Sequence, residues 1–149
     1  MLHYNFYKSE HPSNLLLILL HGFISDSQTY MNHIEAFLTQ CNILTIDLPG
    51  HGKDDSPIDQ TWNFPYITEQ INRVLSQFEK YKFSLLGYSM GGRVALYYAI
   101  YGQYEIKQLI LESTSPGIAD EALRKERQAI DQARGRVLEI AGIEVFVND

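Results

Sequence analysis

Apolar residues occur along the chain in short continuous runs, separated by longer segments in which they recur at helical spacing. The run Leu15–Leu20 is apolar on both faces, which is typical of a central strand in a parallel sheet covered by helices on each side. Three further runs predict strands of the same kind, at residues 42–48, 83–86 and 109–111. Residues 2–8 alternate weakly and precede the turn-forming residues 12–14, so they predict an edge strand.

Helical spacing follows the predicted buried strands. The expected helices cover about residues 29–40, residues 67–78 and a segment after Ser89. Strands that alternate with helices favour βαβ units with right-handed crossovers, and hence an α/β fold with a mostly parallel, doubly wound sheet. From about residue 119 to residue 141 the chain is rich in Glu, Arg and Gln, which predicts a charged helix.

Composition and charge narrow the class of protein. The 149 residues are a one-domain length, with an ordinary balance of 45% hydrophobic and 20% charged residues. A net charge of −6 disfavours nucleic acid and anionic membranes as partners, although it leaves room for a local basic pocket. The single cysteine, Cys41, excludes an internal disulfide, and the N-terminus lacks a secretory signal pattern. We therefore expect a cytoplasmic protein.

The chemistry is concentrated in the segment Gly87-Tyr88-Ser89-Met90-Gly91, a G-x-S-x-G pattern between a predicted strand and a predicted helix. A serine hydroxyl is a weak nucleophile or base unless it contacts a proton acceptor, and a sharp turn pushes its Oγ out of the sheet into a cleft. Glycines two positions to either side relieve the crowding that such a turn creates. The context favours a reactive Ser89 over a serine that only forms a turn, and it indicates the nucleophile elbow of an α/β-hydrolase fold.

Two further segments agree with this interpretation. A helix that starts at the serine directs its free N–H groups at the site, so the Met90 N–H is predicted as one oxyanion donor. His21-Gly22-Phe23 ends the first central strand, where this fold supplies a second donor, and we assign that role to the Phe23 N–H. The His21 side chain is expected to hydrogen-bond the loop, and residues 47–52 are expected to form a structural loop beneath the site.

The catalytic set is incomplete in this chain. Such a serine normally works with a histidine that is oriented by a carboxylate, in the chain order serine, acid, histidine. All five histidines precede Ser89, and the acid best placed after it is Glu112, for which a structural role is expected. The sequence ends within a predicted element. We therefore expect an N-terminal portion of a longer enzyme, or a partner chain that carries the rest, and a last strand with an unpaired apolar edge.

The sequence resembles one family in particular, through residues 87–93, the segment 112–117 and the helix that carries Arg124 and Arg127. That family is 2-succinyl-6-hydroxy-2,4-cyclohexadiene-1-carboxylate synthase, the menaquinone-pathway lyase built on the α/β-hydrolase fold. The resemblance covers essentially the whole chain. It implies part of an α/β-hydrolase core over residues 1–118, truncated after about the sixth strand, and the start of an incomplete helical lid over residues 119–149.

The resemblance also implies a reaction, the elimination of pyruvate from a polycarboxylate cyclohexene substrate, with no metal or cofactor. Ser89, activated by a histidine, abstracts a proton, and the oxyanion site holds the developing enolate. Tyr88 matches a substrate-contacting position, Arg127 matches a lid arginine, and Arg124 lies one turn before it. A substrate with several carboxylates needs fixed positive charge, and Arg93, one helical turn after Ser89, can face the same cleft. Plain surface roles for the three arginines stay open.

Two rival functions are compatible with the same motifs. The first is an ordinary carboxylic-ester or thioester hydrolase in which Ser89 is a covalent nucleophile, because a shared fold does not fix the function. The second is a folding unit or binding module that keeps the elbow and does not turn over substrate. Turnover of a chromogenic ester would favour the first rival, and release of pyruvate from the cyclohexene substrate would favour the lyase.

Overall fold

The computed structural model describes the backbone of residues 1–148 and the side chains of residues 1–147. The chain divides into two compact units, with the division between Ser115 and Pro116. The division expected from the sequence lies after residue 118. Each unit is described separately below.

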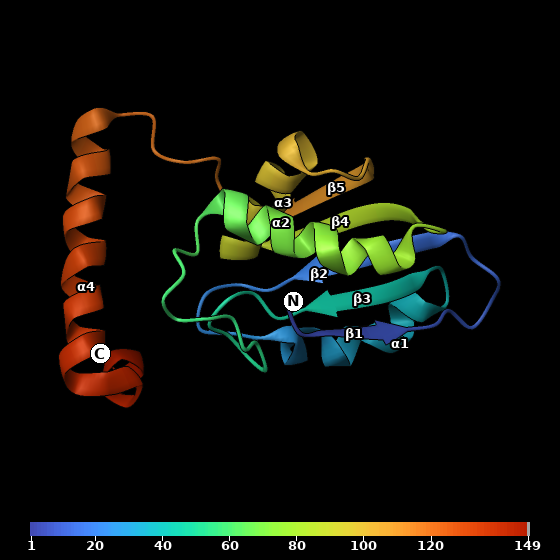
Figure 1. Cartoon of the computed structure of the whole chain (residues 1–149), viewed down its shortest axis with the longest axis horizontal. Coiled ribbons are helices and arrows are strands. Elements are labelled where there is room, and N and C mark those ends of the chain that lie inside the picture. Colours follow the sequence, from blue (N-terminus) through green and yellow to red (C-terminus); the bar gives the residue numbers. More distant parts are fainter. Residues whose placement is uncertain (149) are drawn as a thin grey trace. The chain divides into compact units, whose positions relative to one another are not determined.

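The first unit is built on one five-stranded sheet with the strand order β1-β3-β2-β4-β5 (Figure 1). Its strands are β1 (Tyr4–Tyr7), β2 (Leu15–Leu20), β3 (Asn42–Ile46), β4 (Lys82–Tyr88) and β5 (Ile106–Glu112). β1 is an antiparallel edge strand on β3, and every other pairing is parallel. Leu20 pairs with both Ile46 and Gly87, so the carboxyl ends of the central strands meet at one edge of the sheet.

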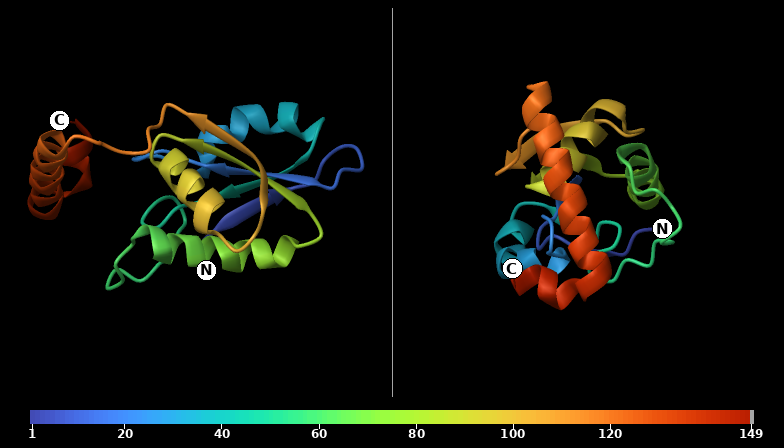
Figure 2. Two further views of the ribbon diagram at one scale, coloured as in Figure 1. Left: turned by 90° about the horizontal axis from the view of Figure 1, so that it is seen from above. Right: turned by 90° about the vertical axis from the view of Figure 1, so that its left-hand side faces the viewer.

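Helices cover both faces of the sheet. The first unit carries α1 (Met31–Leu38), α2 (Phe64–Leu75) and α3 (Met90–Tyr101), and two short 3₁₀ helices, η1 (Ser27–Tyr30) and η2 (Ser76–Phe78). The view from above in Figure 2 shows α1 on one side of the sheet and α2 and α3 on the other. Because both faces are covered, the residues of β2 after Leu15 are buried, as the continuous apolar run predicts.

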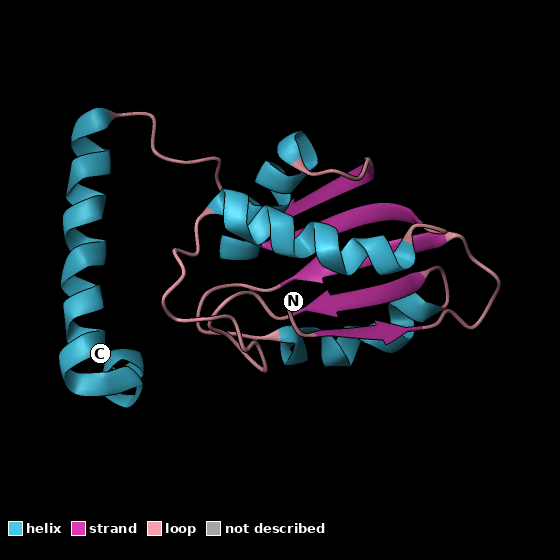
Figure 3. Ribbon diagram, viewed as in Figure 1, coloured by secondary structure: helices cyan, strands magenta, loops and turns pink. Residues whose placement is uncertain are grey.

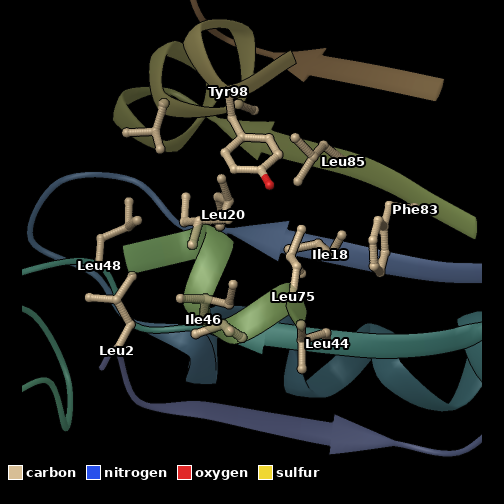
Figure 4. Close-up of a cluster of buried hydrophobic side chains, with 14 of the residues drawn as sticks. Leu2, Ile18, Leu20, Leu44, Ile46, Leu48, Leu75, Phe83, Leu85 and Tyr98 are labelled. Atoms are coloured by element: carbon tan, nitrogen blue, oxygen red, sulfur yellow. The ribbon is translucent and has the colours of Figure 1, made fainter. Parts of the chain in front are cut away.

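The larger core lies between the sheet and the pair α2 and α3. Figure 4 shows Tyr98 of α3 and Leu75 of α2 among leucine and isoleucine side chains from the strands. The buried Tyr98 hydroxyl donates to Asn72 Oδ1 at 2.8 Å, which joins the two helices. α2 begins where the Asn63 side chain accepts a hydrogen bond from the Tyr66 N–H, the usual way to satisfy a free donor in the first turn.

The sequence predicts the strands and helices of this unit with small differences at their ends. The helix expected at residues 29–40 is split into η1 and α1, because Asp26 caps the Gln28 N–H and begins a 3₁₀ turn. β5 begins three residues earlier than its apolar run, since Ile106 and Gln108 still pair with Phe83 and Ser84 of β4. The described residues hold five strands, where the resemblance implies about six.

β5 is the edge strand of the sheet, and its apolar residues Ile110 and Leu111 are exposed. This confirms the expected unpaired apolar edge. β1 forms the opposite edge, and its Phe6 ring stacks on Phe78.

The second unit begins at Pro116 and consists of a loop and the helical segment α4 (Glu121–Asn148), seen in Figure 3 as one long helix followed by a short helical stretch in another direction. Gly142 has φ 80° and ψ 173° and interrupts the helix, close to the predicted end at residue 141. After this break the described residues are helical again. Across residues 1–148, no helix is long and apolar enough to cross a membrane.

Candidate active site

Ser89 lies in the sharp turn between the end of β4 and the start of α3. Its backbone has φ 53° and ψ −112°, a conformation that L-residues rarely adopt. Such a backbone costs about 1–3 kcal/mol, so the surrounding contacts must hold it in place. The strained serine at a strand-to-helix junction is the geometry that the G-x-S-x-G pattern predicts.

The two flanking glycines are required by close backbone contacts. A Cβ placed on Gly87 would lie 2.5 Å from the carbonyl oxygen of Gly91. A Cβ on Gly91 would collide with the carbonyl oxygens of Leu20 and His21, at the end of β2. α3 therefore packs directly against the neighbouring strand, and this fixes where the turn carries Ser89.

Residues at and just after the end of β5 hold both backbone groups of Ser89. The Ser89 N–H donates to the Glu112 carbonyl at 2.9 Å. The Ser89 carbonyl accepts the Thr114 hydroxyl at 2.8 Å. It also accepts two longer bonds from the first turn of α3, from the Gly92 N–H at 3.1 Å and the Arg93 N–H at 3.3 Å.

The loop after β2 lies against the elbow. A Cβ placed on Gly22 would lie 2.9 Å from Cδ1 of Tyr88 and 3.5 Å from the Ser89 Cβ. Phe23 is the residue after Gly22, so it belongs to the part of this loop that lies beside the elbow. Met90 is the first residue of α3, so its N–H has no acceptor within the helix. The assignment of the Phe23 and Met90 N–H groups as oxyanion donors stays a prediction.

His21 is buried in this loop and joins two loops together. Its Nδ1 donates to the Gly22 carbonyl at 2.8 Å, and its Nε2 accepts the Leu48 N–H at 2.9 Å. Burial lowers the pKa of His21, with a further lowering from His51, and outweighs the hydrogen bond to Gly22, which acts to raise it. A neutral imidazole whose two nitrogens are both occupied has the loop-bonding role that the sequence predicts.

Asp47 organises the loop after β3. It is buried, and its carboxylate accepts the Ser27 N–H at 2.9 Å, the Lys53 N–H at 3.0 Å and Nδ1 of His3 at 3.0 Å. Burial acts to raise the pKa of Asp47, but these hydrogen bonds outweigh it and leave the pKa below its usual range. The sequence indicates a structural loop here. It gives no sign that one carboxylate ties together three separate segments.

Tyr30 and Thr114 are neighbours of the site for which the sequence predicts no role, although Thr114 lies within the segment 112–117 that carries the family resemblance. The Tyr30 hydroxyl donates to the Leu20 carbonyl at 2.9 Å. Burial, with smaller effects from Glu112 and Tyr88, raises the pKa of Tyr30, so it stays a neutral donor. No local pattern predicts either contact, because the two hydrogen bonds join residues that are 10 and 25 positions apart in the sequence.

The structure brings no proton acceptor to Ser89. Within the described residues, the Ser89 hydroxyl has no hydrogen-bond partner, and the buried His21 is occupied by its two loop bonds. Glu112 takes part through its backbone carbonyl, which agrees with the structural role expected for it. No histidine follows Ser89 in the sequence.

The three candidate arginines have different surroundings. Arg93 is exposed on the first turn of α3, and within the described residues no acid forms an ion pair with it. In the second unit, Nε of Arg127 contacts both carboxylate oxygens of Asp131, at 2.8 and 2.9 Å. Arg124 donates from Nη1 to the Ile118 carbonyl at 3.1 Å. Of the three, only Arg127 pairs with an acid, and among the described residues Arg93 forms no ion pair at all. A substrate-binding role for Tyr88 and the arginines stays a prediction.

Comparison with known proteins of similar sequence and structure identifies the fold family of this chain. The family described as "alpha/beta hydrolase fold" matches residues 16–139. The protein PHYLLO, chloroplastic, of Arabidopsis thaliana is 26% identical over 147 residues, which are 94% of this chain and 9% of that protein. The 2-succinyl-6-hydroxy-2,4-cyclohexadiene-1-carboxylate synthase of Serratia proteamaculans is 37% identical over 118 residues, which are 78% of this chain and 45% of the relative.

The solved structure of MenH from S. aureus is 58% identical, with a TM-score of 0.96, and the match covers 100% of this chain and 56% of that one. These findings confirm the resemblance seen in the sequence. The chain spans about half the length of the synthase and of the solved structure that it matches.

Proposed function

The chain belongs to the α/β-hydrolase fold family, and from that premise we propose that it supplies the nucleophile half of a menaquinone-pathway lyase. The proposed reaction converts 2-succinyl-5-enolpyruvyl-6-hydroxy-3-cyclohexene-1-carboxylate into 2-succinyl-6-hydroxy-2,4-cyclohexadiene-1-carboxylate and pyruvate. The observation that carries the proposal is the strained Ser89 elbow in a chain 58% identical to the MenH of S. aureus. The name of the Serratia relative supports the choice of product.

The proposed chemistry is a proton abstraction followed by loss of a leaving group. A histidine outside this sequence accepts the Ser89 proton, and the serine oxygen takes the hydrogen from C2, beside the succinyl ketone. The electrons of that C–H bond form C2=C3, the C3=C4 pair moves to C4=C5, and the C5–O bond breaks. Enolpyruvate leaves and becomes pyruvate. While the proton is removed, negative charge develops on the ketone oxygen, where the Phe23 and Met90 N–H groups are proposed to donate.

Positive charge near the elbow supports a substrate with carboxylates. The protein has a net charge of −6, so a polyanion needs a specific cationic contact to approach. Arg93 follows Ser89 by one helical turn, and its guanidinium has no acidic partner among the described residues. A guanidinium binds a carboxylate through two parallel hydrogen bonds, which gives orientation as well as affinity. Tyr88, Arg124 and Arg127 are proposed as further substrate contacts.

The deciding experiment uses the full-length protein that contains this sequence. Pyruvate release from the cyclohexene substrate is measured with a lactate dehydrogenase coupled assay, beside hydrolysis of p-nitrophenyl acetate. The lyase proposal expects pyruvate release that falls about 10²–10⁴-fold in Ser89→Ala. Ester hydrolysis with a burst of nitrophenol, and no release of pyruvate, would overturn it in favour of a serine esterase.

The 149-residue chain by itself provides the second arm. We propose that it binds substrate weakly and turns it over very slowly, because no histidine follows Ser89. Addition of the separately expressed remainder should restore pyruvate release. If the chain alone turned over as fast as the full-length protein, the absent histidine would be irrelevant and the mechanism above would be wrong.

A further inference from the structure

We propose that Thr114 is a positioning residue for the nucleophile, which holds the Ser89 backbone in its strained conformation through the Ser89 carbonyl. The proposal rests on Ser89 being the reactive hydroxyl of the proposed function. It adds a residue from the loop after β5 that neither the elbow pattern nor the family resemblance assigns.

The Thr114 hydroxyl makes the shortest of the hydrogen bonds to the Ser89 carbonyl, at 2.8 Å. The two bonds from within α3, from Gly92 and Arg93, are 3.1 and 3.3 Å long. Both helix bonds are longer than the one from Thr114, so the hydroxyl makes the closest contact that holds the Ser89 carbonyl. Thr114 supplies it from the neighbouring strand end.

The methyl group of Thr114 lies against Gly92. A Cβ placed on Gly92 would lie 2.6 Å from Cγ2 of Thr114 and 2.9 Å from its Oγ1. Gly92, the residue just beyond the G-x-S-x-G pattern, therefore leaves the space that Thr114 occupies. This packing limits the rotation of the threonine side chain, so its hydroxyl stays directed at the Ser89 carbonyl.

One neighbouring segment therefore holds both the N–H and the carbonyl of Ser89. Its N–H donates to the Glu112 carbonyl at 2.9 Å, and its carbonyl accepts from Thr114, two residues further along the same segment. The intervening Ser113 has φ 49°, another left-handed conformation. The turn at Ser113 places the Glu112 carbonyl beside the Ser89 N–H and the Thr114 hydroxyl beside the Ser89 carbonyl. The backbone held in this way fixes the direction of the Cα–Cβ bond that carries Oγ.

The test reads the position of residue 89 without needing substrate or a catalytic base. In a Ser89→Cys background, the introduced thiol lies at the start of α3, where a helix N-terminus lowers the pKa of a cysteine. The rate at which iodoacetamide labels this thiol is measured against pH by peptide mass spectrometry. The proposal expects Thr114→Val, which keeps the shape but removes the hydroxyl, to raise the thiol pKa and to slow labelling about fivefold at neutral pH.

Two controls keep the result interpretable. Thr114→Ser retains the hydroxyl and should label like the parent. The buried Cys41 reports global opening, because it becomes reactive only if the fold loosens. If Thr114→Val exposes Cys41, the smaller Thr114→Ala is compared with Thr114→Ser instead. An unchanged rate and pH profile in a folded variant without the hydroxyl would overturn the proposal, as would a folded Thr114→Ser variant that behaves like Thr114→Val.

The outcome separates this proposal from the proposed function. Labelling that follows the hydroxyl supports a positioning role even if the full-length protein releases no pyruvate. In a full-length lyase, Thr114→Val should lower kcat about fivefold, with little change in KM, and Thr114→Ser should restore it. A change in KM alone would contradict positioning of the reacting group.

Discussion

The Leu48 N–H donates to Nε2 of His21 across 2.9 Å, and this bond joins the loop after β2 to the loop after β3. Because Nδ1 of His21 already donates to the Gly22 carbonyl, the imidazole has no free lone pair for a second proton. Protonation would turn Nε2 into a donor that faces another donor. The loop that carries Phe23 thus depends on a neutral histidine.

The first prediction follows from the lowered pKa of His21. Since its folded-state pKa lies below the ordinary value of 6.5, the unfolded chain binds the proton more readily. The stabilisation is fully present above pH 6.5 and is lost as the pH falls from there through the folded-state pKa. Urea unfolding between pH 5 and pH 8 should show this slope in the parent and a smaller slope in His21→Gln. His33→Gln, at an exposed site, should keep the parental slope; its loss there would contradict the assignment.

The second prediction concerns Asp47, whose protonation affects stability at a lower pH than that of His21 does. Asp47→Asn keeps the size of the side chain but loses the charge that accepts bonds from Ser27, Lys53 and His3. We expect a loss of about 1–3 kcal/mol in the free energy of unfolding at pH 7. Because the folded-state pKa is lowered, this difference from the parent should shrink as the pH falls below 3.8 and through that pKa. The matched control is Asp55→Asn at an exposed site. An equal loss in its free energy of unfolding would contradict this role of Asp47.

Glycine substitutions give the third prediction, a contrast between the two units. Gly91→Ala places a methyl group against the carbonyls of Leu20 and His21, so α3 must shift from the sheet. We expect a loss of more than about 2 kcal/mol and a weakened elbow. Gly135→Ala in α4 meets nothing within 4 Å and should stabilise that helix by about 0.5–1 kcal/mol. Thermal unfolding followed by circular dichroism measures both, and similar signs for the two variants would contradict the contact argument.

Local patterns in the sequence predict most of the fold and the nucleophile. The run Leu15–Leu20 matches β2 residue for residue, because a strand buried on both faces needs an unbroken apolar segment. Ser89 is found because the steric demands of its turn select glycines at fixed spacing. Thr114 and Tyr30 are missed because each acts on a carbonyl that only the folded sheet brings near. Spacing within one segment carries no record of such contacts.

The interpretation of the arginines shows the same limit. Sequence spacing leaves Arg93 equally open to an acid partner or to a substrate, and the structure shows no acid paired with it among the described residues. For Arg127 the i,i+4 spacing to Asp131 is already visible in the sequence, and the structure contains that ion pair. An exposed pair of this kind contributes little to stability, so it does not prevent a role in binding.

The last prediction tests Arg93 as the carboxylate contact in the full-length protein. Arg93→Ala removes a guanidinium that has no acidic partner among the described residues, so stability should change little while the substrate loses a charged hydrogen bond. We expect KM for the cyclohexene substrate to rise about 10–100-fold, with a smaller effect on kcat. Arg93→Lys should recover only part of the affinity, because an ammonium group does not form the paired hydrogen bonds of a guanidinium. Steady-state pyruvate release measures both constants.

The matched control for that experiment is Arg73→Ala, which removes an exposed arginine on α2 that pairs with Glu69 at 3.2 Å. Its loss changes the net charge of the protein by the same amount, so it should leave KM within about twofold of the parent if the effect is local rather than due to overall charge. High salt should weaken long-range attraction in both variants alike and leave the difference between them. An equal rise in KM for Arg73→Ala and Arg93→Ala would assign the effect to net charge and remove Arg93 from the proposed site.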